Sequence, residues 1–221
     1  EKLIVILDMG SKNQKCINTD EYDNIKSVVN DNLKEGIAHT LDETRNLSDS
    51  GQFEDLSLQQ GIRQILYPYE EKEVLNPEWE VILKDIIDSL FEQMSDEEYN
   101  ILNEEFGTYM VSRVYEYRQL LEYLVFRYFA KSIYDYDFLG KCQMLVTNFF
   151  VIRQMDIIRW LDNHREYSFK DRMDVVHIFS RQVEYSEDNI ENLYEDFIFD
   201  DIFKTDSLIA ILWIDSENIY D

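Results

Sequence analysis

The chain has 221 residues, and its 46 aspartates and glutamates exceed its 21 lysines and arginines, which gives a formal net charge of −25. A surface that binds a phosphate backbone needs basic side chains in excess, so this charge excludes a general nucleic-acid binder and disfavours contact with an anionic membrane. Hydrophobic residues are 45% of the chain and aromatic residues 14%, more than disordered acidic segments contain. The composition therefore indicates a folded acidic protein with neutral or basic partners.

The chain contains 6 glycines and 2 prolines. Folds rich in strands and turns use more of both, so the composition favours an all-α fold before any periodicity is considered. Cys16 and Cys142 lie far apart in the sequence and form neither a CxxC pair nor a disulfide framework, which fits a reducing compartment, and we expect a cytoplasmic protein. The first residue is Glu1 rather than methionine, so we expect the chain to be a piece of a longer protein.

The first 75 residues show the least regular pattern. We expect a mixed or helical part there and an all-helical core domain at 76–221, with one continuous domain over 1–221 as the alternative. Residues 3–7 are apolar and predict either a strand or a buried turn of helix. A helix is predicted to begin at Asn18 and to stop at Gly36. The polar residues 40–53 predict a loop, and an amphipathic helix at 56–65 is expected to end at Pro68.

Helix signals become clearer from residue 76. Asn76 followed by Pro77 predicts the start of a helix with one continuous apolar face. Ser95 and Glu98 have the capping-box spacing at the start of the next helix, which Gly107 is expected to break. These local signals depend on few residues and do not require knowledge of the tertiary structure.

Two long helices are predicted over 109–133 and 138–161, separated by a short turn. The second is apolar on nearly every side, so we expect it at the centre of the core. Further helices are predicted to begin at Ser168 and Ser186, and residues 207–214 form a short helix or a strand. The fold class is therefore all-α, either a multi-helix bundle or an irregular orthogonal helical array, with a less regular N-terminal third.

Three arginines interrupt the most apolar helical stretches, namely Arg127, Arg153 and Arg159. An unpaired buried charge costs several kcal/mol, so each guanidinium needs a partner. Either each side chain reaches the surface or a carboxylate, or it holds an anion such as a substrate carboxylate. No GxGxxG, P-loop or GxSxG motif is present, so we do not expect a Rossmann-type nucleotide site. The scattered histidines and cysteines predict no metal site in this chain.

A dense polar stretch runs from Ser180 to Asn189 at a predicted junction of two helices. His177 precedes Arg181 by about one turn, and Arg181 and Glu184 are expected on one helix face. One interpretation is a solvated helix end that is capped by Ser186. The other is a polar cluster that locks two helices together or lines a site.

Three segments together resemble a known family: LEYLVFRYF at 121–129, YDYD at 134–137 and SRQVEYSEDN at 180–189. In their order and in their residues they are similar to the C-terminal helical region of the flagellin lysine-N-methylase family of bacteria. The resemblance covers residues 117–197, and the segment at 180–189 is its most specific part. Tyr185 departs from the family pattern, which has histidine there.

This resemblance implies methyl transfer from S-adenosylmethionine to lysine ε-amines of flagellin, in the cytoplasm before export. The partner is then a basic or lysine-rich protein. The family also has a cysteine-rich N-terminal region expected to hold an iron–sulfur cluster, which two cysteines cannot provide here. We therefore expect no cluster in this chain and no activity from the chain alone.

No catalytic residue is assigned, and the candidates for substrate or cofactor binding share a polar side chain in an unusual context. Six follow from the resemblance and two, Arg153 and His177, from the interrupted helix and the polar stretch. The candidates are Arg127, Arg153, His177, Arg181, Glu184, Ser186, Glu187 and Asn189. A non-catalytic acidic helical module that binds a basic protein is the alternative function, and a mimic of nucleic-acid charge is a third.

Overall fold

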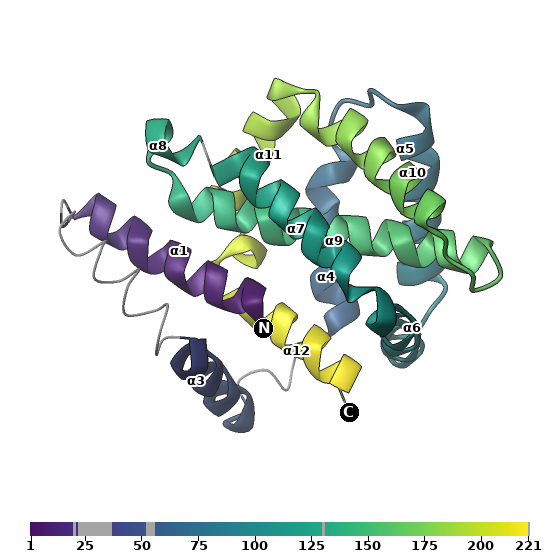
Figure 1. Ribbon diagram of the computed structural model, residues 1–221, viewed down its shortest axis with the longest axis horizontal. Helices are drawn as coiled ribbons and strands as arrows, with labels where there is room; N and C mark the ends of the chain where they lie inside the picture. Colours follow the sequence, from purple (N-terminus) through teal and green to yellow (C-terminus); the bar gives the residue numbers. More distant parts are fainter. Residues whose placement is uncertain (20, 22–36, 52–55, 130, 221) are drawn as a thin grey trace.

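The computed structural model describes residues 1–19, 21, 37–51, 56–129 and 131–220. Helices make up most of these ranges and no strand occurs in them, which confirms the all-α prediction. The helices cross at varied angles and form an irregular array (Figure 1). One hydrophobic core extends from Leu3 to Trp213. The predicted division of the chain at residue 75 stays a prediction.

The N-terminal part is more helical than its sequence indicates. Helix α1 (Lys2–Asn18) includes the apolar residues 3–7, so the strand alternative is wrong there. Asn18 ends this helix, and the rest of the helix predicted up to Gly36 lies outside the described residues. Helix α3 (Ile37–Asp49) occupies most of the segment predicted as a loop and is followed by a turn at Ser50 and Gly51, while residues 52–53 of that segment lie outside the described residues. The Thr40 hydroxyl donates to Asp8 at 2.9 Å, which fastens α3 to α1.

Two predicted helix breakers lie inside helices. Helix α4 (Leu58–Glu70) continues through Pro68 to Glu70, because Pro68 and Tyr69 are both buried against the core, and this packing offsets the backbone hydrogen bond that proline cannot donate. Helix α6 (Asp96–Met110) continues through Gly107, because Phe106 and Met110 on either side are buried in the core. The predicted ends at these two positions were therefore wrong.

The helix starts predicted at Asn76, Ser95, Ser168 and Ser186 are confirmed. Asn76 caps α5 (Pro77–Ile86) by accepting from the Glu78 amide at 3.2 Å, and α5 runs into the π-helical η2 (Ile87–Glu92). Ser95 and Glu98 form the capping box of α6. Ser168 caps α10 (Phe169–Phe179), and Ser186 caps α11 (Glu187–Phe199).

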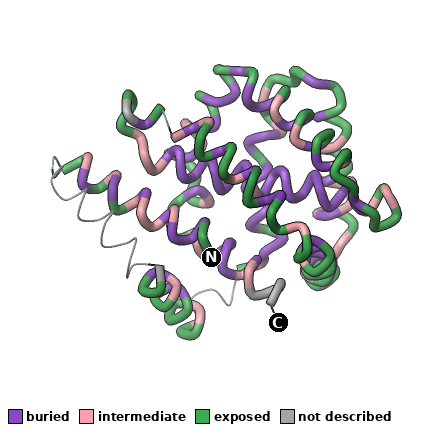
Figure 2. The backbone as a smooth tube through the Cα atoms, viewed as in Figure 1, coloured by how far each residue is buried: buried purple, intermediate pink, exposed green. Residues whose placement is uncertain are grey.

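The long helices are also found, with both boundaries of the first shifted from the predicted 109–133. Helix α7 (Val114–Phe129) follows a 3₁₀ turn, η3 (Val111–Arg113), because residues 109 and 110 still belong to α6. The short α8 (Ser132–Asp135) lies at the predicted turn. Helix α9 (Phe138–Asp162) buries most of its 25 residues and lies at the centre of the array, as predicted (Figure 2).

The last elements complete the cover of α9. The π-helical η4 (Ser180–Glu184) extends α10, and η5 (Asp201–Phe203) joins α11 to α12 (Thr205–Tyr220). Residues 207–214 lie within α12, so the helix alternative was right for that segment. Helices α5 and α10 both pack against α9 and against each other. This arrangement positions the groove described below.

Candidate functional site

A groove of about 620 Å³ lies over the carboxyl-terminal half of α9, between α5 and α10. Met155, Ile158 and Ile178 are almost fully buried and give it an apolar floor. We call it the α5–α10 groove. Its lining residues are Glu78, Val81, Ile82, Asp85, Met155, Ile158, Arg159, Asp162, Asp174, His177, Ile178 and Arg181.

The charged side chains of this groove do not neutralise each other. Four carboxylates and the two guanidinium groups of Arg159 and Arg181 line it, and none of the six makes a hydrogen bond or ion pair with another described residue. Buried arginines elsewhere behave differently, since Arg153 and Arg172 both lie beside aspartates. The groove thus presents charges of both signs to a ligand.

Helical spacing brings these groove residues together. Asp174, His177 and Arg181 follow each other by three and four positions along α10 and η4, so they line the same wall. Glu78 and Asp85 are seven positions apart and occupy one face of α5. His177 and Arg181 are among the candidates that the sequence indicates, whereas the carboxylates are not, although their spacing is visible in the sequence.

Glu184 lies outside the α5–α10 groove, and its side chain contacts α7. Tyr123 donates to its Oε2 at 2.8 Å, Ser180 donates to the same oxygen at 2.6 Å, and Tyr128 donates to Oε1 at 3.4 Å. Arg127 reaches only the main-chain oxygen of Glu184, at 3.4 Å. Burial, and then the hydrogen bond to this carboxylate, raise the pKa of Tyr123 to about 12, so the phenol remains a donor at neutral pH. Hydroxyl groups rather than a cation therefore hold Glu184.

Arg181 and Glu184 do not share one helix face, contrary to expectation. Arg181 lines the groove beside α5 and α9, whereas Glu184 contacts α7. The cause is that η4 is π-helical. A π-helix has more residues per turn than an α-helix, so the residue three positions after Arg181 lies on a different face of the helix. Among the predicted residues, the structure brings His177 to Arg181 and Arg127 to Glu184, in two separate places.

The rest of the polar stretch locks the loop before α5. Asn189 accepts from the Glu73 amide at 3.2 Å and donates to the Glu73 carbonyl at 3.1 Å. Gln182 accepts from the Leu75 amide at 2.9 Å and donates to the Glu73 carbonyl at 2.6 Å. Both interpretations of residues 180–189 hold in part. Gln182 and Asn189 form a locking polar cluster, as the second expects, and Ser186 caps α11, as the first expects. Glu187 is exposed in the first turn of α11.

Arg153 belongs to a third place, where it is buried. Its guanidinium contacts the Asn103 side chain and lies 3.4 Å from the Asp215 carboxylate. Asn103 donates to the same carboxylate at 2.8 Å. A partner on α12 therefore satisfies this arginine, as the carboxylate alternative predicted.

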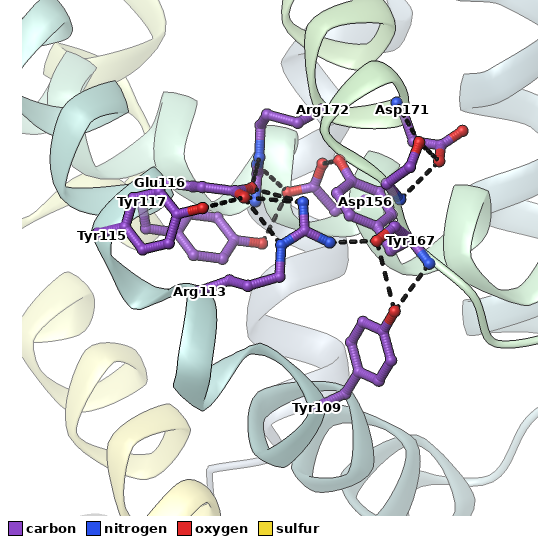
Figure 3. A network of polar contacts seen from close by, with 10 residues as sticks. Tyr109, Arg113, Tyr115, Glu116, Tyr117, Asp156, Tyr167, Asp171 and Arg172 are labelled. Atoms are coloured by element: carbon purple, nitrogen blue, oxygen red, sulfur yellow. Dashed lines mark hydrogen bonds and ion pairs between the residues drawn. The ribbon is translucent and has the colours of Figure 1, made fainter.

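A further polar network joins α7, α9 and α10 (Figure 3). Asp156 is fully buried and accepts hydrogen bonds from Tyr117 at 2.6 Å, from Tyr167 and from Arg172. Burial raises the pKa of Asp156, while Arg172 and the two phenols oppose that shift. Glu116 lies 3.5 Å from the Arg172 guanidinium on the other side. The network holds α10, and with it one wall of the groove, against α9.

No local signal in the sequence indicates this network. Asp156 is one of 46 acidic residues, and nothing local to it distinguishes a buried carboxylate from an exposed one. Cys16 and Cys142 are buried and free. Among the residues described, no cluster of histidine, cysteine and carboxylate side chains is arranged to bind a metal ion. No described helix combines the length and apolar character needed to cross a bilayer.

Comparison with known families relates the chain to a methylase family. The family model of the FliB lysine N-methylase C-terminal domain matches residues 1–211. It extends well beyond residues 117–197, where the motif resemblance lies, and includes α1 and the whole groove. No curated protein and no solved structure matches the chain significantly.

Proposed function

The chain belongs to the FliB lysine N-methylase C-terminal domain family, and on this premise we propose that it is the helical portion of a flagellin lysine N-methylase. The reaction transfers a methyl group from S-adenosylmethionine to the ε-amine of a flagellin lysine, in the cytoplasm before export. The family match over residues 1–211 is the observation that carries this proposal. The relation to flagellin also agrees with the charge of −25, which attracts a lysine-bearing partner.

The α5–α10 groove fits the methyl donor in size and charge. Its volume of about 620 Å³ lies within the usual range for small-molecule sites. S-adenosylmethionine carries a carboxylate, an ammonium group and a methylated sulfonium that supplies the methyl group. Arg159 and Arg181 suit the carboxylate, and the groove carboxylates suit the cationic groups. The apolar floor suits a flat ring.

The groove also contains a proton acceptor for the substrate amine. A lysine ε-ammonium has a pKa near 10.4 and must lose a proton before its nitrogen can attack a methyl carbon. His177 lines the groove, and histidine is the side chain that most often acts as a general base in enzymes. In the proposed reaction His177 would first take a proton from the ammonium group, and the amine nitrogen would then bond to the methyl carbon as the S–C bond of the sulfonium breaks.

Methylation by the full-length protein tests the proposal. Purified flagellin is incubated with S-adenosylmethionine, and its peptides are weighed by mass spectrometry. Arg181→Glu should abolish donor binding in calorimetry and strongly reduce methylation. Arg45→Glu makes the same charge change at an exposed ion pair on α3 and should leave both intact. No heat with the donor and no methylation by the full-length protein would refute the proposal.

The acidic interaction module makes a different prediction in the same assays. Binding of flagellin by a diffuse acidic surface is screened within a few tenths molar salt, because the Debye length falls below about 10 Å. Such binding would survive Arg181→Ala and would occur without methyl transfer. That combination of results would favour the module over the methylase.

A further inference from the structure

The solvent-facing side of α7 carries apolar side chains, whereas the exposed side of a surface helix is expected to be polar. The helix lies across α9 in Figure 1, and exposed residues follow its outer side in Figure 2. Phe126 is 87% exposed and Val114 64% exposed. Leu120 and Leu124, on the opposite side, are buried. A solvent-facing stripe of this kind is typical of an interaction surface.

We call these residues the α7 stripe. At about 100° per residue they fall within roughly a third of the helix circumference, directly opposite the buried side. The stripe consists of Val114, Tyr115, Arg118, Glu122, Val125 and Phe126. Arg118 and Glu122 form an ion pair of 2.8 Å at its centre, with both side chains largely exposed.

The order of residues in the stripe is symmetric about residue 120. Apolar residues lie at both ends and opposite charges lie at equal distances from the centre. If two α7 helices pack antiparallel about a two-fold axis, Arg118 of one copy faces Glu122 of the other, twice. Tyr115 then faces Val125, and Val114 faces Phe126. An interface between identical copies requires this kind of self-complementarity.

We propose that the α7 stripe is the contact surface of a homodimer of this chain. A protein with a charge of −25 repels itself over most of its surface. The stripe carries one charge of each sign, so two copies approach there without net repulsion. A lysine-rich partner would be drawn instead to the acidic surfaces. The inference concerns self-association and does not depend on methyl transfer.

The expected dimer is weak. One helix of 16 residues per copy gives an interface at the small end of the range for specific complexes. The association is therefore expected at micromolar concentrations and should depend on protein concentration in sedimentation velocity. Arg118→Glu places Glu opposite Glu twice, and Glu122→Arg places Arg opposite Arg twice. Each change should weaken dimerisation at least tenfold.

A mixture of the two variants is the decisive measurement. One variant then presents two glutamates and the other presents two arginines, so the mixture should form a heterodimer although neither variant dimerises alone. Lys84→Glu is the matched control, because it reverses a charge in an exposed i, i+4 ion pair that joins α5 to η2 and should dimerise as the wild type does. The heterodimer also shows that both variants are folded.

Three results would overturn the proposal. The first is a full chain that stays monomeric at the highest concentration measured. The second is a dimer that forms equally well with either single charge reversal, since another surface would then be the interface. The third is a mixture that remains monomeric although circular dichroism shows both variants folded.

Discussion

Replacing Asp156 by alanine tests whether the buried network stabilises the array. The change leaves three donors, from Tyr117, Tyr167 and Arg172, without the carboxylate that they share. Removing one partner of a buried ion pair costs about 3–5 kcal/mol of unfolding free energy. Glu116 remains 3.5 Å from Arg172 and still pairs with it, so we expect a loss at the lower end of this range, about 3 kcal/mol. For a chain of this length the melting temperature should fall by about 6–12 °C.

Chemical denaturation and calorimetry measure this loss, and a double-mutant cycle identifies its cause. Arg172→Leu removes the cation, so the double variant should be less destabilised than the sum of the single variants by at least about 1 kcal/mol. Lys204→Ala at an exposed ion pair should change stability by no more than about 0.5 kcal/mol. A cost below about 1 kcal/mol for Asp156→Ala, or strict additivity in the cycle, would refute the reasoning.

Three further changes have definite expected outcomes. Gln182→Ala should cost about 1–3 kcal/mol in urea denaturation and speed amide exchange at Leu75, because buried backbone groups lose their partner. Hydrogen bonds from the Ser95 amide and then from the Ser95 hydroxyl lower the pKa of Glu98. The Glu98 carboxylate therefore stabilises the fold above the ordinary pKa of 4.5, and this stabilisation is lost as the pH falls. Glu98→Gln should therefore destabilise at pH 7, and thermal melts should converge with the wild type in acid. Gly10→Ala should destabilise by about 1–3 kcal/mol in the same melts, because the new Cβ meets the Cys142 side chain where α1 crosses α9.

Several features were determined by the sequence alone, because they depend on neighbouring residues. The caps at Asn76, Ser95, Ser168 and Ser186 mark helix starts in both sequence and structure, since a cap needs only its own side chain and an amide two or three residues later. The central place of α9 follows in the same way, because a helix that is apolar all round must be buried. The family itself was also visible in local motifs.

Other features were decided only by the tertiary structure. The polar α3 forms a helix because it packs on α1, and α6 passes Gly107 because the core holds both flanking turns. The partner of Arg153 is Asp215, which is distant in sequence. The α5–α10 groove combines residues from three helices, and the π-helical turn that separates Arg181 from Glu184 cannot be recognised from spacing. Local patterns determine which segments become helices, whereas long-range packing determines which charges meet and which remain available to a ligand.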